Sequence, residues 1–243
     1  MAIERGVITK HPTDMSDAVF QRLSTTVKRP DILADMRTIS RNTFGFLVRY
    51  VHMVRYYLWI AEQLEDLKPG ARILDLGAGL CPVPLWLASR GHRLDCIDNH
   101  PIVRTLPPQP DWNIWGFFDY SQVHNDITSI RRGIEDCHGE NLYDIAYSIG
   151  VLQSMPRSQW EACLYVTKQS LKPGGRLLLC VDIIPGTDFV WNYDGEVEPL
   201  SEHRTFRELE TCLSVLGYLV EQSSLMRDQN DSLTDPLYIA CRV

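Results

Sequence analysis

Apolar positions along this chain recur with two different spacings, and the alternation of the two predicts an α/β protein. From Phe44 to Leu64 the apolar residues stand three and four apart, which predicts one amphipathic helix over residues 43–67. Short stretches without this spacing predict strands at 73–76, 93–98, 123–127, 143–148, 176–181, 218–222 and 237–242, and the apolar run at 73–76 is of the kind that is buried on both faces of a sheet. Further helices are expected over 13–27, from 31 onward, and over 84–90, 159–171 and 206–216.

The order of these elements favours a doubly wound, mainly parallel sheet with helices on both faces, because strands and helices alternate along the chain. We expect this sheet domain to span residues 68–243. Residues 1–67 are expected to form a helical extension that caps the site or provides a homodimer face, although helices simply packed on the sheet explain the pattern equally well. Residues 101–121, rich in prolines and aromatics, predict an irregular insertion with one helical turn at most.

Composition narrows the classes of protein to consider. The chain has 243 residues, of which 44% are hydrophobic, and its net charge of −7 provides no global basic field for a nucleic-acid backbone. Its seven cysteines include no C-x-x-C pair and stand in mostly apolar settings, which predicts reduced thiols in a cytoplasmic protein and no metal centre. No stretch approaches 18 apolar residues, so we expect no membrane span.

The candidate chemistry lies at the ends of the predicted strands. After the strand at 73–76 the chain turns through three residues, Gly77-Ala78-Gly79, and glycines there allow a sharp turn and a close approach of main chain to a ligand. Ligands of parallel sheets bind beyond the carboxyl ends of the strands. Four polar residues are predicted at those ends: Asp75, Asp98, Asp126 and Ser148.

This arrangement resembles the class I S-adenosylmethionine-dependent methyltransferases, whose sheet is Rossmann-like and seven-stranded. The resemblance covers residues 68–243 and consists of motifs in a fixed order: Asp75-Leu76-Gly77-Ala78-Gly79, Asp98, Asp126-Ile127, Tyr143-Asp144-Ile145 through Leu152, and Leu171 through Leu177. The chain departs from the family at Cys81, where a third glycine is often found, and in its long insertion, which leaves Asp119 as the competitor of Asp126. Pro82 stands where an NAD-binding sheet would require glycine, so methyl transfer is favoured over that rival.

The resemblance implies that S-adenosylmethionine is the cofactor. Asp98 would accept hydrogen bonds from both ribose hydroxyls, and Asp75 would reach the ammonium group directly or through water. Asp126 would accept a hydrogen bond from the adenine amine while Ile127 stacks on the base, although a helix N-cap explains Asp126 almost as well. The full set expected at the cofactor is Asp75, Gly77, Ala78, Gly79, Asp98, Asn99, Asp126, Ile127, Ser148 and Ile149.

The catalytic and acceptor-binding residues are less sharply indicated. The candidates for a general base are His203, at a position that the family pattern favours, and Asp182, at the end of the fifth strand. Without a catalytic role, His203 is explained equally well as a surface histidine at the start of a helix, and Asp182 as a residue that caps a turn. Acceptor contacts are expected from Gln153, Trp191 and Tyr193, although aromatic residues of this kind also pin long loops to a core.

Together these patterns predict a methyltransferase that acts on an oxygen or nitrogen atom of a small-molecule acceptor, such as a metabolite or a saccharide intermediate. A protein or RNA methyltransferase would require a basic or aromatic groove that the sequence does not display. A non-catalytic interaction subunit with the same fold is the third alternative, and binding of S-adenosylmethionine would distinguish it from an enzyme.

Overall fold

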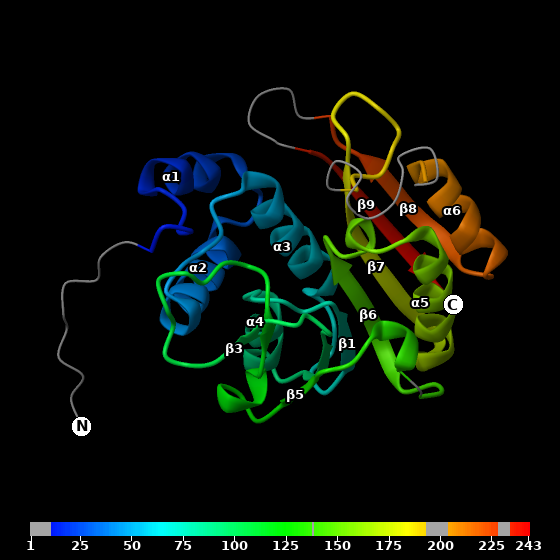
Figure 1. Ribbon diagram of the computed structural model, residues 1–243, viewed down its shortest axis with the longest axis horizontal. Coiled ribbons are helices and arrows are strands. Elements are labelled where there is room, and N and C mark those ends of the chain that lie inside the picture. The colour runs from blue at the N-terminus through cyan, green and yellow to red at the C-terminus, as the bar shows by residue number, and fades with distance from the viewer. Residues whose placement is uncertain (1–10, 138, 193–203, 228–233) are drawn as a thin grey trace.

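The computed structural model describes residues 11–137, 139–192, 204–227 and 234–243, which form a central sheet with helices on both faces (Figure 1). The helices are α1 (Asp17–Thr26), α2 (Pro30–Phe44), α3 (Val51–Leu64), α4 (Val83–Ser89), α5 (Arg157–Ser170) and α6 (Phe206–Val215). The described residues also include the 3-10 turns η1 (Tyr120–Gln122), η2 (Ile134–Asp136) and η3 (Leu152–Ser154). None of the helices in the described part of the chain has the length and apolarity needed to cross a bilayer.

The sheet has seven strands in the order β5-β2-β1-β6-β7-β9-β8, which confirms the predicted doubly wound architecture. Its strands are β1 (Arg72–Leu76), β2 (Arg93–Ile97), β5 (Ile127–Ile130), β6 (Tyr143–Ile149), β7 (Leu171–Ile183), β8 (Leu219–Leu225) and β9 (Asp235–Arg242). Only β9 runs antiparallel to its neighbours β7 and β8 in this sheet. The insertion contributes a separate parallel pair, β3 (Val103–Arg104) and β4 (Phe117–Phe118).

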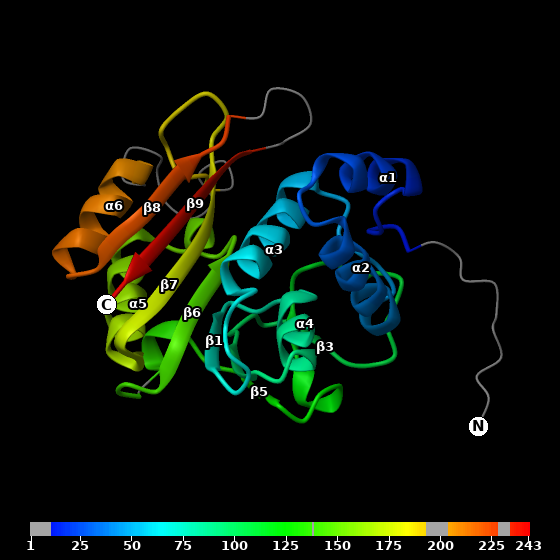
Figure 2. The same cartoon turned by 180° about the vertical axis from the view of Figure 1, so that it is seen from behind.

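Successive side chains of a strand face opposite sides of the sheet, and this alternation produces two apolar layers. Leu178 and Cys180 of β7 belong to the layer that contains α1 to α4. Leu177 and Leu179 belong to the layer that contains α5 and α6. The two groups of helices lie on opposite faces when the molecule is seen from behind (Figure 2). The central strands are covered on both faces and are mostly buried, so they are rich in apolar residues, which is why the sequence reveals them; the edge strand β8 is largely exposed.

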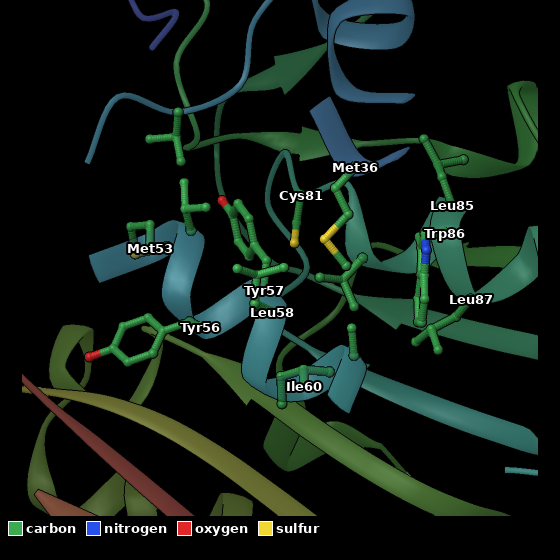
Figure 3. Packing of buried hydrophobic residues seen from close by; sticks show 14 of the residues in the cluster. Met36, Met53, Tyr56, Tyr57, Leu58, Ile60, Cys81, Leu85, Trp86 and Leu87 are labelled. Atoms are coloured by element: carbon green, nitrogen blue, oxygen red, sulfur yellow. The ribbon is translucent and has the colours of Figure 1, made fainter. Parts of the chain in front are cut away.

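The N-terminal extension is part of the first of these layers. Met36 of α2, Tyr57 of α3 and Trp86 of α4 are buried together in one apolar cluster with the sheet (Figure 3). Tyr56 and Tyr57 point to different sides of α3, with Tyr57 toward Cys81 and Tyr56 toward the strands. The helix α3 therefore connects the extension with the glycine turn on one side and with the sheet on the other.

The prediction of one helix over residues 43–67 is wrong, because the chain breaks at Gly45. This glycine adopts φ 83°, and its N–H donates to the carbonyl oxygen of Arg41 at 3.0 Å. Such a left-handed cap ends a helix at little cost only when the residue is glycine. Residues 46–48 are buried without being helical, and Val48 forms an antiparallel bridge with Asp14. The helical spacing of apolar residues therefore extends across residues 45–50, although the chain is not helical there.

The third strand is also shifted from its predicted position. The sequence predicted it over residues 123–127, whereas β5 begins at Ile127 and pairs from there with β2. Before it the chain turns, and the N–H of Asp126 donates to Nδ1 of His124 at 3.2 Å. The shift places Asp126 at the amino end of β5, which is the edge of the sheet opposite to the one where parallel sheets bind ligands.

Candidate active site

A cavity of about 530 Å³ lies at the carboxyl ends of β1, β2, β6 and β7, and its volume is within the range of small-molecule sites. It is bordered by the glycine turn after β1, by the insertion between β2 and β5, by the turn after β6 and by the start of α3. The strand order reverses between β1 and β6, and open α/β sheets place their ligands at this point. Within the described residues no group of three or more side chains is arranged to hold a metal ion.

The glycine turn is held against β2, and both glycines are required by its shape. The N–H groups of Gly77 and of the next residue donate to the carbonyl oxygen of Ile97 at 2.8 and 3.1 Å. Gly77 has φ 75°, and a Cβ there would lie 2.5 Å from Cγ2 of Val151. Gly79 has φ 48°, and a Cβ there would lie 2.7 Å from the carbonyl oxygen of Ile114. This part of the cavity surface is therefore bare main chain.

The carboxylate of Asp98 is oriented by the main chain on both sides. Its Oδ2 accepts the N–H of Gly79 at 2.8 Å, and its Oδ1 accepts the N–H of His100 at 2.7 Å. Each carboxylate oxygen has two lone pairs, so each can accept one further hydrogen bond from a ligand in the cavity that Asp98 borders. This arrangement suits two neighbouring hydroxyl groups.

Asp75 is a buried carboxyl group at the wall of the cavity. It is 2% exposed, and the hydroxyl of Tyr147 donates to its Oδ2 at 2.8 Å. Burial raises the pKa of Asp75 from 3.8 to about 8; the Tyr147 hydrogen bond acts against this rise, and the charge of Asp98 adds to it. Asp75 is therefore largely protonated at pH 7 unless a cation lies beside it.

A second polar group, which we call the Asp182 cluster, borders the cavity at the end of β7. The carboxylate of Asp182 accepts hydrogen bonds from Nε2 of Gln153 at 2.5 Å, the hydroxyl of Thr234 at 2.8 Å and the hydroxyl of Tyr56 at 2.9 Å. The fifth member is His52, whose Nε2 lies 3.9 Å from Oδ1 of Asp182. All five side chains are buried, so the three donors fix the carboxylate in one orientation.

The glycine turn and the Asp182 cluster adjoin each other through the turn after β6. Val151 of this turn is the residue whose side chain lies against Gly77. A Cβ on the preceding Gly150 would lie 3.2 Å from Nε2 of Gln153 and 3.8 Å from Sδ and Cε of Met53 in α3. One short turn therefore contacts both groups, and the same cavity borders both.

The structure brings most of the predicted site residues to this cavity. Those that border it are Asp75, Gly77, Ala78, Gly79, Asp98, Asn99, Ile149, Gln153, Asp182 and Trp191. Ser148 does not, because its hydroxyl lies inside the sheet, 3.2 Å from the carbonyl oxygen of Leu76. Residues 149–151 form that part of the wall instead. Tyr193 and His203 lie outside the described residues.

Asp126 and Ile127 were expected at the adenine, and the structure places both elsewhere. The side chain of Asp126 is 52% exposed at the opposite edge of the sheet, and Ile127 is buried where β5 pairs with β2. The competitor Asp119 caps η1, where it accepts the N–H of Ser121 at 3.1 Å. The shifted strand explains the error, and the residues that border the cavity after β5 are Arg132, Ile134 and Glu135.

The sequence matches no family model and no characterised protein. The structure is similar to the 1,6-didemethyltoxoflavin-N1-methyltransferase of Burkholderia thailandensis, with a TM-score of 0.58 and 17% identity over 99% of this chain and 92% of that one. It is also similar to a putative S-adenosylmethionine-dependent methyltransferase of Listeria monocytogenes, with a TM-score of 0.53 and 15% identity over 75% of this chain and 96% of that one. For phosphoethanolamine N-methyltransferase 2 of Haemonchus contortus the TM-score is 0.56 and the identity 12%, over 77% of this chain and 52% of that one.

The chain has the class I methyltransferase fold. At these sequence identities the similarity establishes the fold alone. The description of the site depends only on the residues of this chain.

In this example of the methyltransferase fold the insertion braces the glycine turn, a role that the sequence did not reveal. The hydroxyl of Tyr120 lies 2.9 Å from the carbonyl oxygen of Gly79 and accepts the N–H of Cys81 at 2.8 Å. The N–H of Leu80 donates to the carbonyl oxygen of Ile114 at 3.0 Å. The aromatic cluster of the insertion was visible in the sequence, but nothing in its spacing indicated which segment it would contact.

We expect the substitution Tyr120→Phe to loosen the glycine turn without unfolding the protein. The buried ring is retained, but the main chain of the turn loses its partner, at a cost of about 1–3 kcal/mol. Hydrogen exchange should show the amides of residues 79–81 exchanging several-fold faster, whereas those of β7 are unchanged. Tyr165→Phe is the control, because Tyr165 is 52% exposed on α5. Equal exchange at residues 79–81 in both variants would contradict the bracing role.

The helix α3 provides a further residue that the sequence analysis missed, His52. It borders the cavity and is 7% exposed. Burial lowers the pKa of His52; the charge of Asp182 acts against this, and that of Arg55 acts with it. The imidazole is therefore neutral at pH 7. His52 follows the apolar pattern of a core helix position, so no sequence signal distinguished it.

Proposed function

We propose that this protein is an enzyme that transfers a methyl group from S-adenosylmethionine to an oxygen or nitrogen atom of a small-molecule acceptor. The observation that carries the proposal is that one and the same cavity is bordered by the glycine turn with Asp98 and by the Asp182 cluster. The glycine turn with Asp98 offers bare main chain and a carboxylate that can accept hydrogen bonds from two ribose hydroxyls. The Asp182 cluster offers buried polar contacts for a second molecule, the methyl acceptor. Two of the neighbours with this fold contain S-adenosylhomocysteine, which supports the choice of cofactor.

The residues of the chain fit the parts of this cofactor. When bound, the cofactor supplies an electrophilic methyl group. Asp98 would accept hydrogen bonds from the two ribose hydroxyls through its unused lone pairs, and Asp75 would ionise and pair with the ammonium group. The bare main chain of the glycine turn allows close approach. After the correction of β5, Glu135 takes the place of Asp126 as our candidate acceptor for the adenine amine, with Ile134 beside the base.

A small acceptor is favoured by the volume of the cavity and by the enclosure of its second half. The polar atoms of the Asp182 cluster are buried, so a flexible macromolecular segment would have to enter far into the protein to reach them. The Burkholderia and Haemonchus neighbours were solved with small molecules, 1,6-didemethyltoxoflavin and phosphomonomethylethanolamine. The net charge of −7 is unfavourable for an RNA acceptor.

Isothermal titration calorimetry with S-adenosylmethionine and S-adenosylhomocysteine tests this function. We expect saturable binding of both ligands, with about one site per chain. Release of S-adenosylhomocysteine from the methyl donor in the presence of an acceptor would establish the reaction. Absence of binding would contradict the proposal, and binding without transfer to any acceptor would favour the non-catalytic alternative.

A further inference from the structure

One buried atom at the cavity wall lacks a partner. Gln153 is 1% exposed, and its Nε2 donates to Asp182, but its Oε1 accepts no hydrogen bond within the described part of the chain. An unsatisfied buried acceptor costs about 1–3 kcal/mol, so it is tolerated where a ligand supplies the missing donor. Because Gln153 borders the cavity, this atom marks the place of an N–H or O–H group of the acceptor.

The neighbouring His52 provides a base at the same wall. The 3.9 Å between its Nε2 and Oδ1 of Asp182 exceeds hydrogen-bond distance, so the two groups are not hydrogen-bonded to each other, and the imidazole borders the cavity where it can reach a ligand. The groups that face the imidazole are Asp182 from β7, Arg55 from its own helix, and the rings of Tyr50 and Tyr56 at 5.8 and 6.1 Å between centroids. A neutral imidazole in these surroundings accepts a proton.

Aromatic residues flank these polar atoms. The main-chain N–H of Trp191 donates to the carbonyl oxygen of Asp182 at 2.8 Å, which fixes Trp191 beside the cluster. Tyr50 stacks on His52, and both border the cavity together with Met53. Aromatic and thioether side chains pack favourably on the faces and edges of planar rings. The acceptor end of the cavity therefore combines flat apolar walls with one base and one free acceptor atom.

We propose that the acceptor is an aromatic or heteroaromatic ring that carries a ring hydroxyl or ring N–H beside a second hydrogen-bond donor, and that His52 is its general base. The inference rests on the proposed function and specifies its acceptor. His52 takes the proton, the electron pair of the broken O–H or N–H bond forms the new bond to the methyl carbon, and the carbon–sulfur pair remains on sulfur as a neutral thioether. Gln153 Oε1 accepts a hydrogen bond from the second donor.

This proposal changes the role that the sequence indicated for Asp182. Its two oxygens already accept three hydrogen bonds, from Gln153, Thr234 and Tyr56. A carboxylate held in this way is poorly placed to take a proton during the reaction, but well placed to fix the Gln153 amide and to favour a protonated His52. Asp182 is therefore a positioning residue.

Three probes separate the elements of the proposal. Catechol is planar and has two adjacent hydroxyls, phenol lacks the second donor, and cis-cyclohexane-1,2-diol has both hydroxyls but no flat ring. With S-adenosylmethionine present, we expect formation of S-adenosylhomocysteine to be fastest with catechol. Its kcat/KM should exceed that of phenol about tenfold, which corresponds to one hydrogen bond to a buried group. The saturated diol should not be methylated.

Variants then assign the residues. His52→Gln should lower kcat with catechol at least a hundredfold, the lower end of general-base contributions, and remove the acid limb of the pH profile. Binding of S-adenosylhomocysteine should be unchanged. Gln153→Met should remove the preference for catechol over phenol. His92→Gln is the matched control, because His92 is also buried but does not border the cavity, and it should leave every parameter unchanged.

The outcomes distinguish this inference from the function on which it rests. Loss of S-adenosylhomocysteine binding in the parent protein would remove the proposed function itself. If binding is retained, equal methylation of the saturated diol or absence of methylation of catechol would overturn the acceptor class. A His52→Gln variant that binds S-adenosylhomocysteine normally and turns over within threefold of the parent protein would overturn the assignment of the base. His52→Asn serves as a second variant if His52→Gln does not fold.

Discussion

Replacing Asp98 with alanine should weaken the binding of S-adenosylmethionine by more than tenfold. The carboxylate would lose two hydrogen bonds to ribose hydroxyls, and each hydrogen bond to a charged group contributes about 1.5–3 kcal/mol. The glycine turn would also lose a support, because Asp98 accepts the N–H of Gly79. Isothermal titration calorimetry at constant pH and salt measures the change directly.

Asp126→Ala is the matched control for that experiment, and it also tests the position of the third strand. Asp126 was the sequence-based candidate for the adenine, but the structure places it at the opposite edge of the sheet from the cavity. We expect its replacement to leave the dissociation constant unchanged. If Asp126→Ala weakened binding as much as Asp98→Ala does, the register of β5 would be wrong.

Replacing Asp75 with asparagine should stabilise the ligand-free protein. The pKa of Asp75 is raised from 3.8 to about 8, so its favourable contribution to folding is complete below pH 4 and is lost as the pH rises through 8. Asparagine keeps an acceptor for the Tyr147 hydroxyl and has no charge to lose. We expect the melting temperature at pH 7 to rise by roughly 5 °C or more, and the gain to disappear near pH 4.

The contrast for this measurement is Asp95→Asn. Asp95 is also buried, but it is paired with Arg72 at 2.8 Å and with the hydroxyl of Tyr143 at 2.7 Å. Removing its charge breaks an ion pair, so the melting temperature should fall. A fall for both variants at pH 7 would contradict the account of Asp75 as a carboxyl group held in unfavourable surroundings.

The same Asp75→Asn substitution should weaken the binding of S-adenosylmethionine. In the parent protein the ammonium group would stabilise the ionised carboxylate, so binding below pH 8 should release a proton and affinity should increase from pH 6 to pH 8. The variant has no proton to release, and its affinity should vary less with pH. Titrations in buffers of different ionisation enthalpy count the protons, and equal release from both proteins would contradict the assignment.

The central part of the fold was predictable because its signals are local. The strand β1 (Arg72–Leu76) and the turn at Gly77 and Gly79 are contiguous in the sequence, and each glycine has a direct steric consequence there. The buried strands of the sheet were found for the same reason, since strands covered on both faces are continuous apolar runs. Asp98 followed from the end of such a run.

The errors arose where a pattern has two physical explanations. The apolar residues around Gly45 fit a helix, yet the same residues are buried in an irregular segment. The stretch before Ile127 fits a short strand, but the chain turns there before β5 begins. A slip of a few residues moved Asp126 from one edge of the sheet to the other, so a small error in an element boundary became a wrong site residue.

The remaining contributors to the site depend on contacts between distant parts of the chain. Tyr120 reaches the glycine turn about forty residues earlier, and Tyr56 of α3 reaches Asp182 of β7. In the sequence both tyrosines follow the pattern of ordinary core positions. His52 was missed in the same way, because its burial and its neighbours, rather than its spacing, give it chemical interest.

The most direct test of the central claim is a crystal structure of the protein with S-adenosylhomocysteine. The account predicts that the ribose hydroxyls lie within hydrogen-bond distance of both oxygens of Asp98, that the amino acid part lies beside Gly77 and Asp75, and that the sulfur faces the Asp182 cluster. A nucleoside bound elsewhere on the protein, or one in this cavity with its ribose away from Asp98, would contradict it.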